Sequence, residues 1–158
     1  MRRNRTFRIL RRLGAQQGTS MLELAFLLPT LTMLLLGVLE FGRLLFAAIE
    51  VTDAARAGVA YGSRTLVTAM DTSGMQTAAT NDAPDNISGT MVPTATTICQ
   101  CSDGTATTCA KAASVCASPK HVLEYVQVKT VASIDPIFHV PGLPTKYTVN
   151  GSAIMRVQ

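Results

Sequence analysis

The longest hydrophobic segment of the chain runs from Leu24 to Leu39 and contains no charged residue. A helix that crosses a bilayer needs about 20 apolar residues, and the segment reaches that length when it is counted from Thr19. A water-soluble amphipathic helix would show a polar face, whereas this segment has little polarity beyond two threonines. Pro29 lies inside it, and a membrane helix can carry a proline with a kink. The pattern therefore predicts a membrane-spanning helix.

The helical pattern continues beyond the apolar segment and becomes amphipathic over residues 40–63. Two pairs of opposite charge, Glu40 with Arg43 and Asp53 with Arg56, have the i,i+3 spacing of a solvated helix surface. One helix from the start of the span to residue 63 would be about 65 Å long, far longer than a bilayer requires. Its outer half must therefore pack on its own domain, on neighbouring subunits, or on both. The expected apolar stripe consists of Phe41, Leu44, Leu45, Ala48, Thr52, Ala55 and Val59.

After this helix the periodicity changes from helical to strand-like. A short helix could hold Met70, Met75, Ala78 and Ala79, and the following "NDAPDNISG" is typical of a turn or loop. Three segments rich in β-branched residues then follow, at residues 90–99, 121–134 and 146–158. We therefore predict an α+β fold, in which the long helix packs on a small, mainly antiparallel sheet of about three strands. The cysteine loop links the first two strands.

The basic character of the chain is confined to its first 18 residues. The formal net charge is +4, but six of the 14 basic residues are arginines of this leader, which contains no acid. The rest of the chain holds eight basic residues against ten acidic ones. We therefore expect no nucleic-acid binding, because no basic patch remains outside the leader. The positive-inside rule places the leader in the cytoplasm and the residues after the span in an oxidising compartment.

Four cysteines, Cys99, Cys101, Cys109 and Cys116, lie in one short window. Their spacing, C-x-C-x7-C-x6-C, fits poorly with the C-x2-4-C pairs of zinc sites. We therefore favour two structural disulfides, with a metal site and a redox centre as alternatives. Cys99 and Cys101 are expected to point to opposite faces and not to bridge each other. Among the remaining pairings, we favour the nested one, Cys99 with Cys116 and Cys101 with Cys109, slightly over the crossed one.

The leader differs from an ordinary secretory signal, in which the apolar region precedes the cleavage site. Here the apolar region follows Gly18, so a cut after Gly18 would remove all six arginines and leave the hydrophobic helix on the mature chain. Thr19 would then carry the free amine, and Glu23 lies one helical turn further on. The Glu23 carboxylate could pair with this amine, with the positive end of the helix dipole, or with the amine of a neighbouring subunit. The alternative is that Glu23 lies at the headgroup level and pairs with nothing.

These residues resemble a known family. The segment "GTSMLELAFLLP" is similar to the processing region of class III prepilins. The longer stretch of about residues 15–63 resembles the TadE-like minor pilins, or pseudopilins, of the Flp (Tad, type IVb) pilus system. The motifs that carry the resemblance are Glu23, Pro29, the Gly37-x-x-Glu40-Phe41-Gly42 segment, and Ala54-Ala55-Arg56 with Gly58. The sequence departs from the family at Leu24, where a second aromatic residue is often found.

The resemblance implies three regions and a set of partners. Residues 1–18 would be a cytoplasmic leader that prepilin peptidase removes, residues 19–63 a helix that spans the membrane to about residue 40, and residues 64–158 a periplasmic or extracellular α+β domain. Glu40, Phe41, Gly42 and Arg56 would belong to the assembly helix, together with Pro29. The implied partners are the peptidase, other minor pilins, the Flp major pilin, the inner-membrane Tad platform proteins and membrane lipid. The protein would be a single-pass protein of the bacterial inner membrane that can also enter the extracellular pilus.

The sequence offers little that points to catalysis. His121 and His139 are interpreted as surface residues, because no nucleophile elbow accompanies Ser118 or Ser133. No Gly-rich phosphate loop occurs, and we expect neither a cofactor nor a metal. Two other functions remain as alternatives to a pilus component. One is a signal-anchored protein whose outer domain binds a ligand, and the other is a membrane-tethered enzyme with its active site in the cysteine loop.

Overall fold

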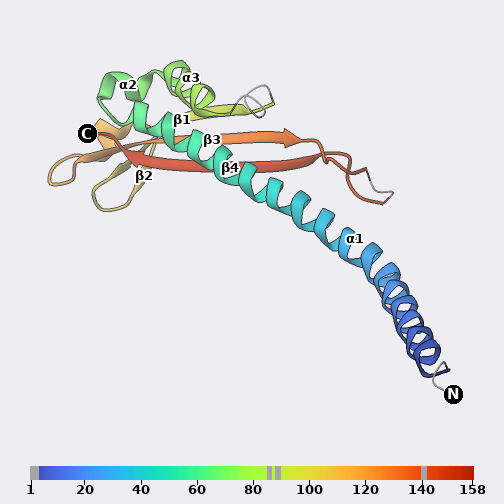
Figure 1. Ribbon diagram of the computed structural model, residues 1–158. Coiled ribbons are helices and arrows are strands. Elements are labelled where there is room, and N and C mark those ends of the chain that lie inside the picture. The colour runs from blue at the N-terminus through green and yellow to red at the C-terminus, as the bar shows by residue number, and fades with distance from the viewer. Residues whose placement is uncertain (1–3, 85–86, 88–89, 140–141) are drawn as a thin grey trace. The chain divides into compact units, whose positions relative to one another are not determined.

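The computed structural model describes residues 4–84, 87, 90–139 and 142–158, with side chains from Thr19 onward. The chain divides into two compact units, Met1–Gly42 and Arg43–Gln158. Helix α1, Asn4–Gly62, runs through the first unit and into the second (Figure 1). The predicted long helix is confirmed, but it begins in the leader rather than at Thr19.

The second unit contains a four-stranded antiparallel sheet with the strand order β2-β1-β3-β4. Three long strands, β1 (Val92–Cys101), β3 (Val122–Ile134) and β4 (Tyr147–Arg156), occupy the three segments that the sequence predicts. The short strand β2 (Ala106–Thr107) was not predicted, and it extends the sheet at the edge of β1. The α+β class is confirmed, and the segment that links β1 to β3 holds Cys109 and Cys116, while Cys99 and Cys101 lie in β1.

Strand β3 is the centre of the sheet because it pairs with β1 on one side and β4 on the other. Its even-numbered residues from Val126 to Ile134 are buried, while Lys129 and Val131 are exposed on the opposite face. A shift of one residue in the pairing would exchange these two faces, so the alternation fixes the register. The one buried polar side chain in this row, Thr130, donates a hydrogen bond of 2.7 Å to the backbone carbonyl of Val51. This bond ties the sheet to α1.

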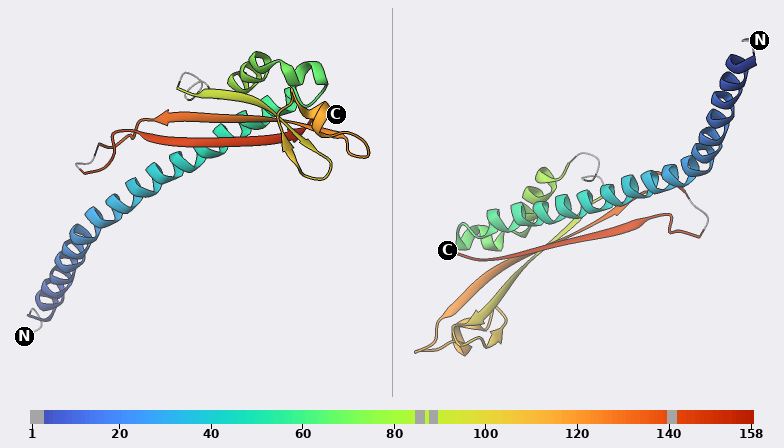
Figure 2. Two further views of the ribbon diagram at one scale, coloured as in Figure 1. Left: turned by 180° about the vertical axis from the view of Figure 1, so that it is seen from behind. Right: turned by 60° about the horizontal axis from the view of Figure 1, so that its bottom comes forward.

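The part of α1 beyond residue 42 and the short helices α2 (Leu66–Met70) and α3 (Thr72–Asp82) lie on one face of the sheet (Figures 1 and 2). Two clusters of buried residues fill the space between the helices and the strands. One cluster comprises Ala55, Val59, Ala69, Met75, Ala79, Ala95, Val126, Val128 and Val157. The other comprises Ala47, Val51, Ala54, Ala83, Ile87, Met91, Ala132 and Ile134.

The helical stripe that packs on the sheet is displaced from the predicted one. Ala55 and Val59 are fully buried as expected, but Phe41 and Leu45 are exposed. The buried face passes instead through Ala47, Val51 and Ala54. The prediction was wrong at Phe41 and Leu45, because the sheet covers a neighbouring side of the helix that shares Ala55 and Val59 with the predicted stripe. The large apolar residues on the outer side are consequently left uncovered by this chain.

Close approach between α1 and the sheet depends on glycine. A Cβ atom added to Gly58 would lie 2.9 Å from the backbone oxygen of Met75 and 3.1 Å from a methyl group of Val128. One added to Gly151 would lie 2.6 Å from the backbone oxygen of Val51. Real Cβ atoms do not approach backbone oxygens this closely, so these two glycines set the spacing of helix and sheet.

Side chains cap both short helices after α1. Thr65 accepts a hydrogen bond from the backbone N–H of Thr68 at the start of α2. Asp71 accepts from the backbone N–H of Gly74 at the start of α3 and from the hydroxyl group of Tyr61 at 2.9 Å. Hydrogen bonds from Ser73, Gly74 and Tyr61 lower the pKa of Asp71, which keeps the capping carboxylate ionised. The single short helix expected around Met70 and Met75 is therefore two helices that meet at Asp71.

A candidate assembly helix and a stapled hairpin

The predicted processing junction lies inside α1. The helix includes residues on both sides of the Gly18–Thr19 peptide bond, and four residues separate Thr19 from Glu23. At 3.6 residues per turn, this spacing places the two residues on one face, as the sequence predicts. The free amine that would pair with Glu23 exists only after a cut, so the uncut chain does not test that interaction.

The apolar part of α1 has many exposed side chains among the described residues. Over Thr19–Gly62, the helix is long and apolar enough to cross a membrane. The exposed apolar side chains of this part are Met21, Leu22, Leu24, Phe26, Leu27, Leu28, Leu31, Met33, Leu34, Leu35, Val38 and Leu39. Pro29 lies within the continuous helix, and the Thr32 hydroxyl donates a 2.7 Å hydrogen bond to the carbonyl of Leu28 nearby. A surface of this kind suits a single-pass membrane anchor, because lipid or other helices must cover it.

The Glu40-Phe41-Gly42 segment is partly exposed on α1. Phe41 and Gly42 are exposed, and Glu40 is half-buried. A methyl group added to Gly37 or Gly42 would meet no neighbouring side chain or element of the described chain within 4 Å. These two glycines are therefore not required by packing within the chain. Small residues at such positions let a second helix approach closely.

The residues of the Ala54-Ala55-Arg56 motif have two different environments. Ala54 and Ala55 are fully buried against the sheet, whereas Arg56 points outward and is 68% exposed. Arg56 forms the predicted i,i+3 pair with Asp53 at 2.7 Å. An exposed pair of this kind contributes little to stability. The two alanines thus hold α1 on its own sheet, and Arg56 marks the side of the helix that faces away.

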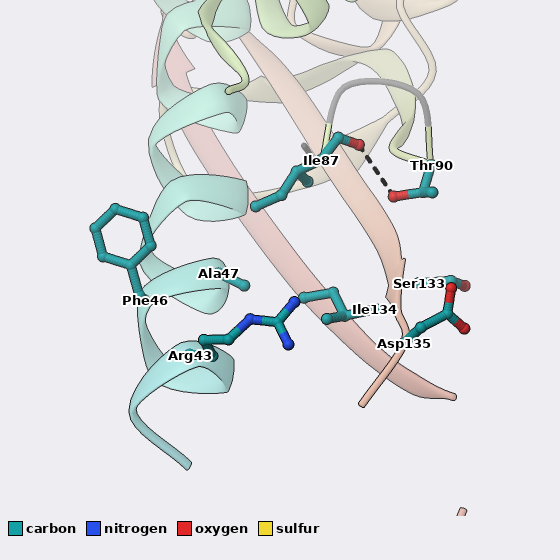
Figure 3. Close-up of a pocket in the computed structure, with 8 residues that line it drawn as sticks. All are labelled: Arg43, Phe46, Ala47, Ile87, Thr90, Ser133, Ile134 and Asp135. Carbon is teal, nitrogen blue, oxygen red and sulfur yellow. Dashed lines mark hydrogen bonds between the residues drawn. The ribbon is translucent and has the colours of Figure 1, made fainter. Parts of the chain in front are cut away.

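A pocket of about 210 Å³ lies between α1 and the C-terminal end of β3 (Figure 3). The side chain of Arg43 projects from α1 toward β3, and Asp135 lies immediately after the end of that strand. The pocket is lined by Arg43, Phe46, Ala47, Ile87, Thr90, Ser133, Ile134 and Asp135.

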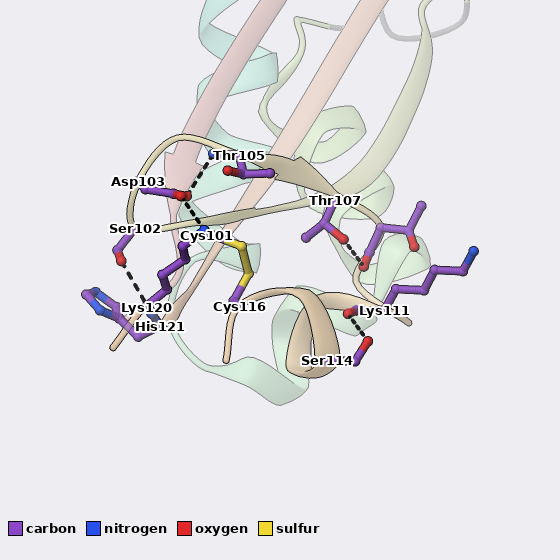
Figure 4. The surroundings of a disulfide bond; sticks show 11 residues. Cys101, Ser102, Asp103, Thr105, Thr107, Lys111, Ser114, Cys116, Lys120 and His121 are labelled. Atoms are coloured by element: carbon purple, nitrogen blue, oxygen red, sulfur yellow. Dashed lines mark hydrogen bonds and ion pairs between the residues drawn. A yellow bond between two sulfur atoms is a disulfide. The ribbon is translucent and has the colours of Figure 1, made fainter. Parts of the chain in front are cut away.

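Two disulfides staple the hairpin that follows β1. Cys99 is bonded to Cys109. Cys101 is bonded to Cys116, as Figure 4 shows. The two disulfides are confirmed, but the favoured nested pairing is wrong, because these bonds cross. The expectation that Cys99 and Cys101 point to opposite faces is also wrong. Residues two apart in a strand share a face, and both cysteines are buried in β1.

The register of the hairpin explains the crossed pairing. Cys99 lies opposite Thr107 in the β1–β2 ladder, and the backbone N–H of Cys101 donates to the carbonyl of Thr105. The returning chain therefore reaches Cys109 beside Cys99, after it has already passed Cys101. The short helix α5 (Ala112–Val115) then turns the chain back and delivers Cys116 to Cys101.

An ion pair closes the tip of the same hairpin. Lys120 lies 2.7 Å from the carboxylate of Asp103, which also accepts a hydrogen bond from the backbone N–H of Thr105 (Figure 4). These contacts, that of Lys120 first, lower the pKa of Asp103 to about 2. Gly104, which lies between Asp103 and Thr105, has a φ of +86°, a conformation that suits glycine. The tip is thus an ordered turn and not a loose loop.

We expect paired cysteine replacements to reveal the pairing through stability. Cys99→Ser with Cys109→Ser removes one bond and should lower the free energy of unfolding by about 3 kcal/mol, with no free thiol. Cys99→Ser with Cys116→Ser breaks both bonds, so its loss should be about twice as large. The measurements are urea unfolding and a thiol count under denaturing, non-reducing conditions. The crossed pairing would be contradicted if Cys99→Ser with Cys116→Ser lost less free energy of unfolding than Cys99→Ser with Cys109→Ser.

The described residues bear on the metal-site and redox alternatives. They contain no group of three or more His, Cys, Asp or Glu side chains that could hold a metal. They also contain no free cysteine. Ser133 lines the pocket, whereas the backbone N–H of His121 contacts the Ser102 hydroxyl in the stapled hairpin.

The fold is that of an α+β protein whose long helix carries an exposed apolar part, long and apolar enough to anchor the chain in a membrane. Residues 18–60 match the family of TadE-like proteins. The resemblance seen in the sequence is therefore confirmed over the junction, the apolar segment and most of the outer helix. No curated protein and no solved structure matches the chain. The matched family supports a component associated with the Tad pilus, and this family is structural rather than catalytic.

Several residues that shape these sites were not singled out from the sequence. The sequence indicates only a surface ion pair for Arg43 and no role for Asp135. Gly58 belongs to the family motif, whereas the sequence gives Gly151 no part in packing. A Cβ atom added to Gly62 would clash with the side chain of Met75. The spacing of Gly58 and Gly62 by one helical turn could have indicated a close helix contact. No sequence signal places Gly151 against α1, because that contact joins distant parts of the chain.

Proposed function

We propose that this chain is a TadE-like minor pilin or pseudopilin, a structural component for the assembly of a Flp/Tad pilus. The observation that carries the proposal is the family match over residues 18–60. This segment includes the glycine of the junction, the uncovered apolar helix and the Ala-Ala-Arg motif. The proposal concerns the whole chain, although the match covers only its helical part.

Prepilin peptidase would cut the chain after Gly18 on the cytoplasmic side of the inner membrane. The arginines of residues 1–18 would hold the N-terminus inside until the leader is removed. Thr19 would then be the first residue, and its amine would lie one turn from Glu23. In the low dielectric of a membrane or a helix bundle, this pairing would matter more than at a surface. The partner amine could belong to the same chain or to a neighbouring subunit.

One face of the outer half of α1 packs on this chain's own sheet, and the other face would pack on other subunits of the assembly. Its inner face packs on the sheet through Ala47, Val51 and Ala55. Leu45, Phe46 and Ile49, in contrast, are each more than half exposed beyond the span. An uncovered apolar stripe on a helix is typical of a surface that packs against another helix. It supports packing against other minor pilins and the Flp major pilin.

Residues 64–158 would form the periplasmic or extracellular domain, beyond a helix of residues 19–63 that spans the membrane to about residue 40. The two disulfides support this location, because such bonds persist in oxidising compartments. The inner-membrane Tad platform proteins and membrane lipid would be further partners, and the protein would work without a cofactor or catalytic residues.

The proposal is tested by identifying the first residue of the mature chain. The full chain is expressed with a prepilin peptidase, extracted from membranes and analysed as intact protein and as N-terminal peptides by mass spectrometry. We expect the mature chain to begin at Thr19. An uncut chain, or a cut at any other bond, would contradict the processing that the proposal requires.

A further inference from the structure

Strand β4 forms one edge of the sheet, and its outer side has no partner strand in the described chain (Figure 1). The backbone N–H of Val157 donates to the carbonyl of Glu124 at 2.9 Å. This pair continues the register of β3 with β4, and bonded and non-bonded pairs alternate along an antiparallel ladder. The odd-numbered residues of β4 therefore bond to β3, and its even-numbered residues point their N–H and C=O groups away from the sheet.

The outward groups extend over the whole length of β4. The residues that present them are Thr148, Asn150, Ser152, Ile154 and Arg156, and each of these residues is exposed. The register with β3 runs without a bulge from Tyr147 to Arg156, and β4 contains no proline. Bulges, prolines and charges are the devices that usually block an edge strand, and of these β4 has only Arg156 at its end. The edge is therefore open to a further strand.

The opposite edge of the sheet is protected. By the same alternation, the odd-numbered residues of β1 point outward. Pro93 at the start of β1 has no N–H group, and the stapled hairpin bonds to Cys99 and Cys101 at its end. Between them, the Thr97 hydroxyl donates a 2.9 Å hydrogen bond to the carbonyl of Ala69 in α2. The open edge of β4 is thus not a general property of this sheet.

The direction of α1 disfavours a second copy of this chain as the partner. The outer half of α1 runs in the same direction as β4, because Val51 lies against Gly151 and the carbonyl of Ser63 accepts from the backbone N–H of Gln158. Two β4 strands paired antiparallel would therefore direct their α1 helices in opposite directions, whereas copies anchored in one membrane need the same direction. This step rests on the proposed function. Pairing of β4 with β1 of a second copy is blocked at the protected edge.

The two sides of the open edge indicate the chemistry of a partner strand. On the face away from α1, the charged residues of β1, β3 and β4 are Lys129 and Arg156, both cations. On the other face, Thr52 of α1 lies over Gly151. Leu45, two helical turns before Thr52 on the same side of α1, is 52% exposed. Because side chains alternate between the two faces of a strand, a matching strand alternates acidic residues with apolar ones.

We propose that β4 accepts an extended segment of a different protein as an added strand of the sheet. Hydrogen bonds to the outward backbone groups of β4 hold the segment and supply most of its affinity. Its apolar side chains pack beside Leu45, and its acidic side chains lie near Arg156. This interaction goes beyond the proposed function, because the partner binds through its backbone at the sheet edge and not through a helix.

Hydrogen exchange of the full chain in detergent tests the proposal with a designed peptide. The probe has the ten-residue length of β4 and alternates valine with glutamate, while a control peptide alternates valine with lysine. Without peptide, the amides of the even-numbered residues of β4 should exchange faster than those of the odd-numbered residues. The glutamate peptide should protect the even-numbered amides, and the lysine peptide should bind about tenfold more weakly. Arg156→Gln should remove most of this difference.

Two changes at Ser152 separate the backbone of the edge from its side chains. Ser152→Pro removes one outward N–H group, and proline is tolerated in an edge strand whose N–H faces solvent. It should weaken binding of the glutamate peptide about tenfold, whereas Ser152→Ala, the matched control, should leave binding unchanged. Protection of the odd-numbered amides reports whether both variants keep the sheet.

Four results would overturn the proposal. They are even-numbered amides that are protected without peptide, protection of these amides that rises with protein concentration alone, no protection by the glutamate peptide, and equal binding of the two peptides. The second result would assign the edge to another copy of this chain. The uncut Gly18→Leu chain should behave like the native chain, because β4 lies within the unit Arg43–Gln158. Failure of the strand site can thus be told apart from failure of the pilus role.

Discussion

Replacing Gly18 with leucine should leave the precursor uncut while the chain still inserts into the membrane. Glycine has no side chain, so a peptidase can approach the peptide bond that follows it closely. The bond also lies within α1, and local unwinding is needed before it can enter an active site. Leucine adds bulk and favours the helix by about 1 kcal/mol relative to glycine, so it opposes both requirements.

The matched control for this change is Gly14→Leu. Gly14 lies one helical turn before Gly18 in the same helix, so the change adds the same side chain and the same helix propensity to the leader. The control chain should still be cut after Gly18, and the ratio of precursor to mature protein on a membrane immunoblot measures the difference. Normal processing of Gly18→Leu, or loss of processing in both variants, would contradict a specific role for Gly18.

Replacing Gly151 with alanine should destabilise the outer unit by about 2–4 kcal/mol. The added methyl group would lie 2.6 Å from the carbonyl oxygen of Val51, 2.7 Å from the Thr130 hydroxyl oxygen and 2.8 Å from the Cα atom of Thr52. Two of these atoms belong to the backbone of α1, so no change of rotamer relieves the clash. The helix must move away from the sheet, which also breaks the buried hydrogen bond from Thr130 to Val51.

Hydrogen exchange of the full chain in detergent measures this effect on the amides of β3 and β4. Gly42→Ala is the matched control, because its added methyl group meets no neighbouring side chain or element within 4 Å. The control should keep the protection of the native chain. Equal protection in Gly151→Ala would show that α1 does not approach the sheet as closely as the structure places it.

The elements that the sequence predicts well are those whose signal is local. The charge-free segment from Leu24 to Leu39 predicts a long helix by itself, and the alternation of residues 121–134 predicts β3. The face of α1 that packs on the sheet could not be predicted in the same way. Both sides of that helix carry apolar residues, and only contacts with distant strands decide which side is buried. The stripe was therefore placed on the side that includes Leu45, which the structure leaves exposed.

The cysteine pairing and the pocket could not be predicted from the sequence for a related reason. The nested pairing assumed one open loop, but the two-residue strand β2 returns Cys109 to Cys99. A strand this short leaves no periodicity to detect. The pocket joins Arg43 to Asp135 across 92 positions of the chain, and such a contact follows from the sheet register alone. The junction at Gly18 and Glu23, in contrast, depends on spacing within one helix, and it stays a prediction from the sequence.

The central claim is that the uncovered face of α1 packs on other pilin subunits. A photo-reactive amino acid at Ile49, an exposed position on this face, tests it most directly in cells that assemble the Tad pilus. The control position is Lys129, which is exposed on the sheet face that no described helix covers. Irradiation should yield covalent adducts of the Ile49 variant with minor pilins or the Flp major pilin, and none for the Lys129 variant. A processed Ile49 variant that forms no adduct with any pilin subunit would contradict the account.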